Sequence, residues 1–233
     1  MGEQPTNDQG TPIPEEPIDP QSTFDSAQEP ESTPSWEHTD KYGFFGALIR
    51  TIGEVLFHPE HTFRNMKMGG IGAPFLYGWL LKSIFAMISF YQVRRMMFGE
   101  FQRWMPDEFG SFPQFDFFPA LFLIIPIGVA LGMFIMTGIL HVCLMIAGGA
   151  KRDIEATFRV VAYSAGATAV WLIIPWVGSM ISGIWQLVAE IIGLKEAHQT
   201  TYGRVILAFL IPFIVCCGLG ALALGTMIGK MPW

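Results

Sequence analysis

The chain has 233 residues, of which 51% are hydrophobic and 15% are charged, and its mean hydropathy is +0.40. Average soluble domains carry about 25% charged residues, so this composition argues against a soluble protein. The net charge of −6 is unevenly distributed, because residues 1–40 contain ten acidic side chains and no Lys or Arg. The sequence therefore predicts an acidic tail joined to a mildly basic membrane domain.

Residues 1–42 are predicted to form a disordered, Pro-rich cytoplasmic tail. Residues 1–40 contain seven prolines and scattered apolar side chains, too few to offset the entropy of ordering the segment. No basic segment followed by an apolar segment opens the chain, so we expect no cleaved secretory signal. Such a tail is either a docking segment for a protein partner or a solvating extension.

Residues 43–68 are predicted to form an amphipathic helix and a linker. A helix at the inner membrane surface has this apolar pattern, and so does a helix that packs on a soluble core. Because no soluble core is predicted, we expect the interfacial position. Pro59 closes the pattern, whose apolar residues are Phe44, Phe45, Leu48, Ile49, Ile52, Val55 and Leu56.

Residues 69–233 are predicted to form an all-α, multi-pass membrane bundle with five transmembrane helices. Each span needs about 20 mostly apolar residues. Three candidates cover 74–91, 119–147 and 205–228, and Pro126 is expected to bend the second. Residues 160–194 are too long for one span, and Pro175, Gly178 and Ser179 divide them into spans at 160–177 and 180–194.

The distribution of basic residues favours a cytoplasmic N-terminus. With five spans, nine Lys and Arg residues lie on the cytoplasmic side and four on the external side. A four-span alternative, in which the third and fourth spans merge, weakens this ratio to eight against five. The external loop 92–118 is rich in aromatic residues, as expected for chain at a membrane interface.

Neither a catalytic site nor a metal or cofactor site is predicted. The sequence lacks the Gly-x-Ser-x-Gly, His-Glu-x-x-His, Cys-x-x-Cys and Gly-x-Gly-x-x-Gly patterns. Cys143, Cys216 and Cys217 lie in apolar spans and are interpreted as small buried hydrophobes. We therefore expect no enzymatic activity, no cofactor and no nucleic-acid partner.

Ionisable side chains within the predicted spans are the candidate binding residues. Each charge costs about 2.5–3.5 kcal/mol at mid-membrane on insertion scales. The rise per residue places Lys82, His141 and Glu190, together with Tyr163, at a similar depth near the cytoplasmic side. Such a cluster binds a lipid headgroup or a proton-coupled solute. In the alternative, a self-neutralising pair of Lys82 and Glu190 fixes helix packing, with His141 bonded to a backbone carbonyl.

Small residues at four-residue spacing allow two helix backbones to approach closely. Internal packing is the simpler expectation, and a homo-oligomer through these faces is the alternative. The stripes are Gly128 and Gly132 in the second span, and Ala221, Gly225 and Gly229 in the last.

Short motifs fill the segment from 147 to 198. They comprise Gly148, Gly149, Phe158, Arg159, Val160, Ala162, Tyr163, Ser164, Ile174, Pro175, Trp185, Gly193, Leu194 and His198, and Phe57, Pro59 and Phe63 precede the first span. This pattern resembles the Yip family of five-span, Ypt/Rab-interacting membrane proteins, in particular its bacterial members. The resemblance implies a non-enzymatic membrane organiser, adaptor or trafficking-type scaffold in a bacterial inner membrane. The alternative is a small transporter or a lipid-binding protein that uses Lys82 and Glu190.

Overall fold

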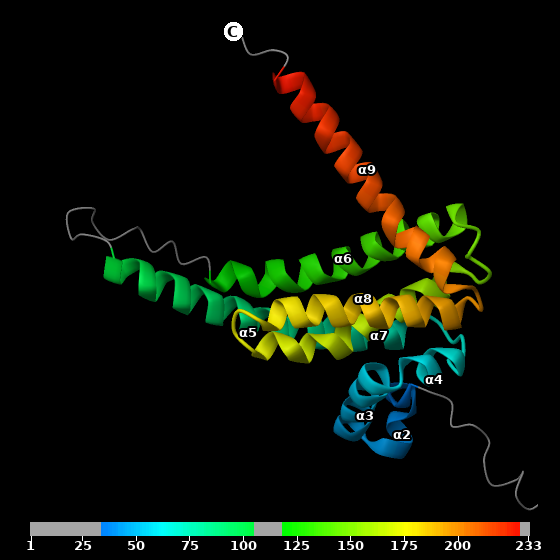
Figure 1. Cartoon of the computed structure of the whole chain (residues 1–233). Helices are drawn as coiled ribbons and strands as arrows, with labels where there is room; N and C mark the ends of the chain where they lie inside the picture. The colour runs from blue at the N-terminus through cyan, green and yellow to red at the C-terminus, as the bar shows by residue number, and fades with distance from the viewer. Residues whose placement is uncertain (1–33, 105–117, 229–233) are drawn as a thin grey trace, which may run out of the picture. The chain divides into compact units, whose positions relative to one another are not determined.

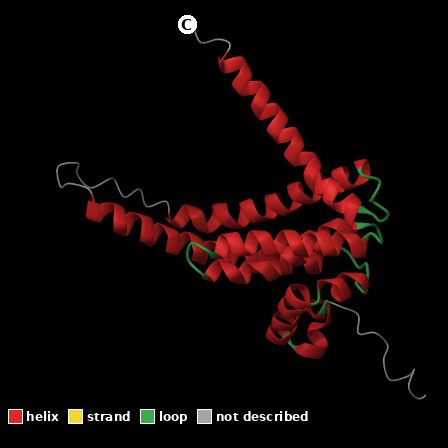
Figure 2. Cartoon of the chain, in the orientation of Figure 1, coloured by secondary structure: helices red, strands yellow, loops and turns green. Residues whose placement is uncertain are grey.

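The described chain is built from helices. The computed structural model describes residues 34–104 and 118–228, and within these ranges every regular element is a helix, as predicted (Figures 1 and 2). The elements are η1 (Ser35–His38), α2 (Thr39–Tyr42), α3 (Phe44–Phe57), α4 (Pro59–Arg64), α5 (Gly72–Trp104), α6 (Phe118–Ile146), α7 (Ile154–Thr168), η3 (Ala169–Ile173), α8 (Gly178–Ala197) and α9 (Tyr202–Ile228).

Three stretches in the described chain are long and apolar enough to cross a membrane: Gly72–Met96, Ala120–Ile146 and Ile154–Ile173. A shorter apolar stretch covers Tyr202–Val215 of α9. Helix α8 has the length of a span, but its C-terminal half contains Glu190, Lys195 and Glu196, which lower its hydropathy. The helical membrane domain is therefore confirmed, and the five-span topology stays a prediction.

The chain breaks between the third and fourth predicted spans, near Pro175. Helix η3 ends at Ile173 and α8 begins at Gly178, where a Cβ would lie 2.1 Å from the carbonyl oxygen of Trp171. Beyond this turn, Thr157 lies against His198 and Val160 lies against Gly193. Helices α7 and α8 therefore run antiparallel beside each other.

Helix α5 is longer than its predicted span. The sequence predicts a span at 74–91 followed by an aromatic loop at 92–118, but α5 continues to Trp104. The extra turns contain Arg, Glu and Gln, which have high helix propensity and extend a helix without being apolar. Residues 105–117, where the rest of the loop is predicted, lie outside the described residues.

Helix α7 lies at the centre of the packing. Each of its residues from Ala156 to Thr168 is buried, against α3, α5, α6 and α8. Helices α5 and α7 approach each other closely because each carries a glycine at the contact, Gly78 on α5 and Gly166 on α7. A Cβ on Gly78 would lie 2.4 Å from the carbonyl oxygen of Ala162, and one on Gly166 would lie 2.7 Å from the Tyr77 ring. Polar side chains on α7 are consequently shielded from solvent and need partners within the protein.

Helix α3 occupies the predicted amphipathic segment and ends before Pro59. Its buried face packs against η1 and α7 through Ala47, Thr51, Val55 and Leu56. Its other apolar side chains stay exposed: Phe44, Phe45, Ile49 and Phe57. One face of α3 therefore packs within the protein, and the exposed face keeps the interfacial position as a prediction.

The end of the predicted tail is folded. Residues 1–33 lie outside the described residues, but η1 and α2 occupy positions 35–42. The indole of Trp36 is 5% exposed, donates a hydrogen bond of 2.9 Å to the carbonyl oxygen of Ala73, and packs against Phe44 and Tyr77. The disorder predicted through residue 42 does not extend to these residues, because Trp36 and its neighbours bond to the membrane domain.

Candidate functional site

Arg159 of α7 is the most enclosed charge among the described residues. Its side chain is 1% exposed and forms an ion pair with Glu37 of η1. The hydroxyl of Tyr163, one turn further along α7, donates a hydrogen bond of 2.6 Å to the same Glu37 oxygen. A carboxylate that accepts from both a guanidinium and a phenol is held by charge-assisted bonds, the strongest hydrogen bonds in proteins.

The segment from Ser35 to Glu37, here called the anchor, contacts three helices. The Ser35 backbone N–H donates to the Glu54 carboxylate of α3 at 3.0 Å, and the Trp36 N–H donates to the Thr51 hydroxyl at 2.8 Å. Trp36 reaches α5 through Ala73, and Glu37 reaches α7 through Arg159. The anchor is therefore bonded to the membrane domain on three of its helices.

The linker before α5 completes the surroundings of Arg159. One guanidinium nitrogen donates to the carbonyl oxygen of Gly70 at 2.7 Å. Glu155, one turn earlier on α7, lies 4.0 Å from that nitrogen and accepts hydrogen bonds from the N–H groups of Gly69 and Gly70. Nε of Arg159 has no hydrogen-bond partner within the described chain. The guanidinium is therefore flanked by two carboxylates, one in direct contact and one 4.0 Å away.

A second polar group lies between α5 and α8. The Lys82 amine donates to the side-chain oxygen of Gln186 at 3.1 Å, and the Gln186 amide donates to the Glu190 carboxylate at 2.8 Å. The predicted partners Lys82 and Glu190 are thus linked through Gln186, which the sequence reasoning missed. Its spacing of four residues from Glu190, which puts both side chains on the same face of α8, was the signal that could have identified Gln186 as a partner.

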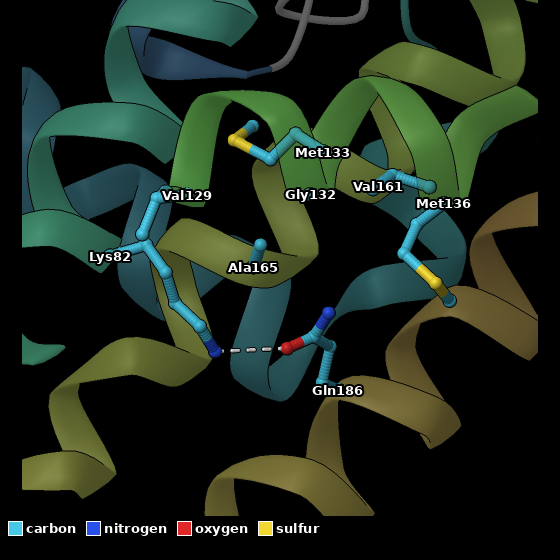
Figure 3. A pocket seen from close by; sticks show the side chains of 8 residues that line it. All are labelled: Lys82, Val129, Gly132, Met133, Met136, Val161, Ala165 and Gln186. Carbon is cyan, nitrogen blue, oxygen red and sulfur yellow. Dashed lines mark hydrogen bonds between the residues drawn. The ribbon is translucent and has the colours of Figure 1, made fainter. Parts of the chain in front are cut away.

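A cavity of about 170 Å³ opens beside Lys82 and Gln186. Figure 3 shows the two polar side chains joined by a hydrogen bond, with residues of α6 and α7 around them. The other lining residues are apolar: Val129, Gly132, Met133 and Met136 of α6, and Val161 and Ala165 of α7.

The small-residue stripe of α6, Gly128 and Gly132, does not face another helix closely. A Cβ on either glycine would meet nothing within 4 Å, so the expected internal packing of this stripe is absent. The second stripe, from Ala221 to Gly229, lies outside the residues whose side chains the structure describes.

A third group joins α6, α7 and the loop after α8. Nδ1 of His141 lies 2.9 Å from the Thr157 hydroxyl, which lies 2.9 Å from Nε2 of His198. The backbone N–H of Arg152 donates to Nδ1 of His198 at 3.2 Å, so a neutral His198 carries its proton on Nε2. Thr157 then accepts from His198 and donates to His141. The partner of His141 is a hydroxyl instead of the expected carbonyl.

Burial determines the charge state of His198. The side chain is fully buried, and burial lowers the pKa of His198 to about 4, with further lowering by the nearby His141 and Arg152. The imidazole is therefore neutral at pH 7.

On α8, the hydrogen bond from Arg64 lowers the pKa of Glu196, which keeps that carboxylate ionised and connects α4 to α8.

The four predicted binding residues therefore lie in three groups. Lys82 and Glu190 share one group, Tyr163 belongs to the Arg159 group, and His141 belongs to the His198 group. The partner Glu37 was missed because residues 1–42 were interpreted as disordered tail. In the described chain, no three His, Cys, Asp or Glu side chains are arranged to hold a metal ion.

The remaining motif residues position these groups. Gly148 and Gly149 form the turn after α6, where Gly148 has φ of +68°. Pro175 lies in the turn before α8, and the Trp185 indole donates to the carbonyl oxygen of Leu56 at 3.2 Å. Ser164 is buried on α7 with its hydroxyl unpaired within the described chain. Gly193 packs against Val160 and Phe63.

The comparison with known families matches residues 53–224 to the Yip1 domain. The chain belongs to the Yip1 domain family. No curated protein and no solved structure matches it. The match confirms the resemblance and shows an integral membrane protein of the Yip family. It begins within α3 and ends within α9, so the anchor at Ser35–Glu37 precedes the Yip1 domain and packs against it.

Proposed function

We propose that this Yip1 domain protein is a non-enzymatic membrane adaptor whose N-terminal tail binds a protein partner. The observation that carries this proposal is the anchor. Ser35, Trp36 and Glu37 are each bonded to the membrane domain, so the chain that precedes them is tethered to that domain. Residues 1–40 contain ten acidic side chains and no basic ones, a charge pattern that attracts a basic partner.

We further propose that this end of the protein is cytoplasmic, in a bacterial inner membrane. Contacts gather basic residues of separate loops at one end of the helices. Lys151 donates to the carbonyl oxygen of Gln199, and Arg204 donates to the carbonyl oxygen of Gly148. Cytoplasmic loops carry an excess of Lys and Arg, which supports this orientation. The exposed face of α3 then lies at the inner membrane surface.

Crosslinking and mass spectrometry in native membranes test the adaptor function. Three forms are compared: the full chain, a chain lacking residues 2–33, and a chain in which residues 2–33 are scrambled. All three keep the anchor, so the membrane domain stays intact. A partner captured by the full chain and lost from both altered forms supports the adaptor. Retention by the scrambled chain would show that charge alone recruits the partner, and equal capture by all three forms would reject the docking function.

A second candidate function is solute or lipid binding, as in a small transporter. The cavity beside Lys82 and Gln186 favours it, because ionisable groups inside a membrane domain mark binding sites and transport pathways. Solute flux into proteoliposomes, compared between the native chain and Lys82→Met, tests transport. Flux that depends on Lys82 supports transport, and equal flux in protein-free vesicles argues against it.

A further inference from the structure

The cavity beside Lys82 lies deep in the membrane domain. Lys82 comes ten residues after the start of α5 at Gly72, and Gln186 comes eleven residues before the end of α8 at Ala197. At 1.5 Å per residue both positions are about 15 Å from the same end of their helices. Both polar side chains therefore lie well inside their helices, away from the helix ends.

The walls of the cavity leave an opening toward the bilayer. Helix α6 packs on α5, α7 and α9, whereas α8 packs on α3, α4, α7, η3 and α9. The cavity lies between α6 and α8, and Met136 on its rim is 44% exposed. Typical sites for drug-sized ligands measure about 300–1,000 Å³, so about 170 Å³ holds only one end of a chain molecule. The rest of such a molecule extends into the bilayer.

The charge of the polar group restricts what enters. Lys82 and Glu190 carry opposite formal charges and are linked through Gln186, so the formal charges of the group cancel. An anion in the cavity adds a further charge among apolar walls, where a charge is costly. The bond to Gln186 uses one of three N–H donors of the ammonium group. The group therefore favours an uncharged hydrogen-bond acceptor.

We propose that this cavity binds an uncharged, single-chain acyl lipid of the monoacylglycerol type. Its ester carbonyl accepts a hydrogen bond from Lys82, and the first part of its acyl chain lies against Val129, Met133 and Met136. The proposal rests on the second candidate function, binding at this cavity, and is independent of the adaptor function of the tail.

Photo-crosslinking in proteoliposomes at pH 7 tests the proposal. Two probes carry a diazirine at the same chain position: a monoacylglycerol with an oleoyl chain, and oleate. Mass spectrometry of the digested protein locates the label. We expect the monoacylglycerol to label residues 129–136 at least about tenfold more than oleate, the ratio that corresponds to about 1.4 kcal/mol. Equal or stronger labelling by oleate would overturn the uncharged ligand but leave the cavity as a binding site.

Two substitutions make the test specific. Gly132→Leu fills the cavity and abolishes labelling, whereas the matched control Gly138→Leu, on the same helix and also open to a side chain, retains it. Glu190→Gln keeps the hydrogen bond to Gln186 and removes the balancing charge, so the preference reverses toward oleate. Labelling that Gly132→Leu leaves unchanged would place the lipid elsewhere, and absence of labelling by either probe would reject this inference. Solute flux that depends on Lys82 would still support the second candidate function in that case.

Discussion

Arg159 shows how one buried charge orders a segment that composition predicts to be disordered. Its guanidinium is 1% exposed and lies in the middle of the packed face of α7. A buried charge without a partner is strongly unfavourable, and Glu37 supplies that partner from outside the Yip1 domain. The order of the anchor is therefore a requirement of α7 and not a property of the tail.

The first prediction concerns this ion pair. Glu37→Ala leaves Arg159 with one carboxylate at 4.0 Å, so we expect the free energy of unfolding to fall by about 3 kcal/mol. Thermal unfolding of the detergent-solubilised protein measures the change. Asp40→Ala, an exposed carboxylate on α2, is the matched control and should change the stability by less than about 0.5 kcal/mol. Equal effects of the two substitutions would contradict a special function of Glu37.

The second prediction concerns pH. The folded pKa of His198 is about 4, below the ordinary value of 6.5, so between these values the unfolded chain binds a proton that the folded protein does not. Stability therefore decreases as the pH falls from 6.5 to about 4, by up to about 3 kcal/mol in total. The unfolding temperature measured across this range should lose part of its pH dependence in His198→Gln and keep it in the exposed control His58→Gln. Identical pH profiles for the native chain and His198→Gln would refute the assignment.

At the scale of single residues, the sequence indicated which polar side chains lie within the helices better than it indicated their partners. Lys82, His141, Tyr163 and Glu190 were predicted as binding residues because polar groups are rare in apolar spans. Their partners Gln186, Thr157 and Glu37 are ordinary polar residues, which local sequence does not distinguish from solvated ones. Depth along a helix also says nothing about which neighbour a side chain faces, so one predicted cluster became three groups.

At the scale of helices, glycines determine how closely the elements pack. Helix α8 carries two of them after its first turn, and their surroundings differ. A Cβ on Gly193 would lie 2.7 Å from Val160 and 2.8 Å from the Phe63 ring, whereas one on Gly183 would meet nothing within 4 Å. The motif residue Gly193 therefore permits the contact of α8 with α4 and α7.

This pair of glycines gives the third prediction. Gly193→Ala forces Phe63 and Val160 to move, so we expect a loss of about 1–3 kcal/mol in the free energy of unfolding. Gly183→Ala adds a methyl group in open space and gains up to about 1 kcal/mol of helix propensity. Thermal unfolding of both variants in the same detergent tests the difference. A stabilising effect of Gly193→Ala would show that α8 does not pack as described.

Helix positions were largely predictable, and their ends were not. The apolar pattern predicted α3, the positions of α6 and α9, and the break near Pro175. It missed the extension of α5 to Trp104, because an apolar stretch indicates where a helix can cross a membrane and not how far the helix continues beyond it. It also missed η1, which is ordered by the contacts of Trp36 and Glu37 in a polar segment. Both errors arise where helix formation depends on propensity or tertiary contact instead of apolar periodicity.

At the scale of the whole molecule, one labelling experiment distinguishes the five-span topology from the four-span topology. The five-span prediction places the turn before α8 outside and the loop after α8 inside, whereas the four-span alternative puts that loop outside. We therefore predict that Val177→Cys reacts with an impermeant thiol reagent from the external side and that Thr201→Cys reacts only from the cytoplasmic side. Both positions are exposed. Native cysteines replaced by alanine provide the background, and external labelling of Thr201→Cys would support four spans.

The anchor also has a mechanical consequence. Three consecutive residues bond to α3, α5 and α7, so a pull on the chain before Ser35 is shared among three helices at once. Bonds that share a load yield together, at a higher force than bonds that open one after another. A force applied before Ser35 therefore reaches α7, the most buried helix of the domain, at the same time as α3 and α5, and it bypasses α2, which follows the anchor in the chain.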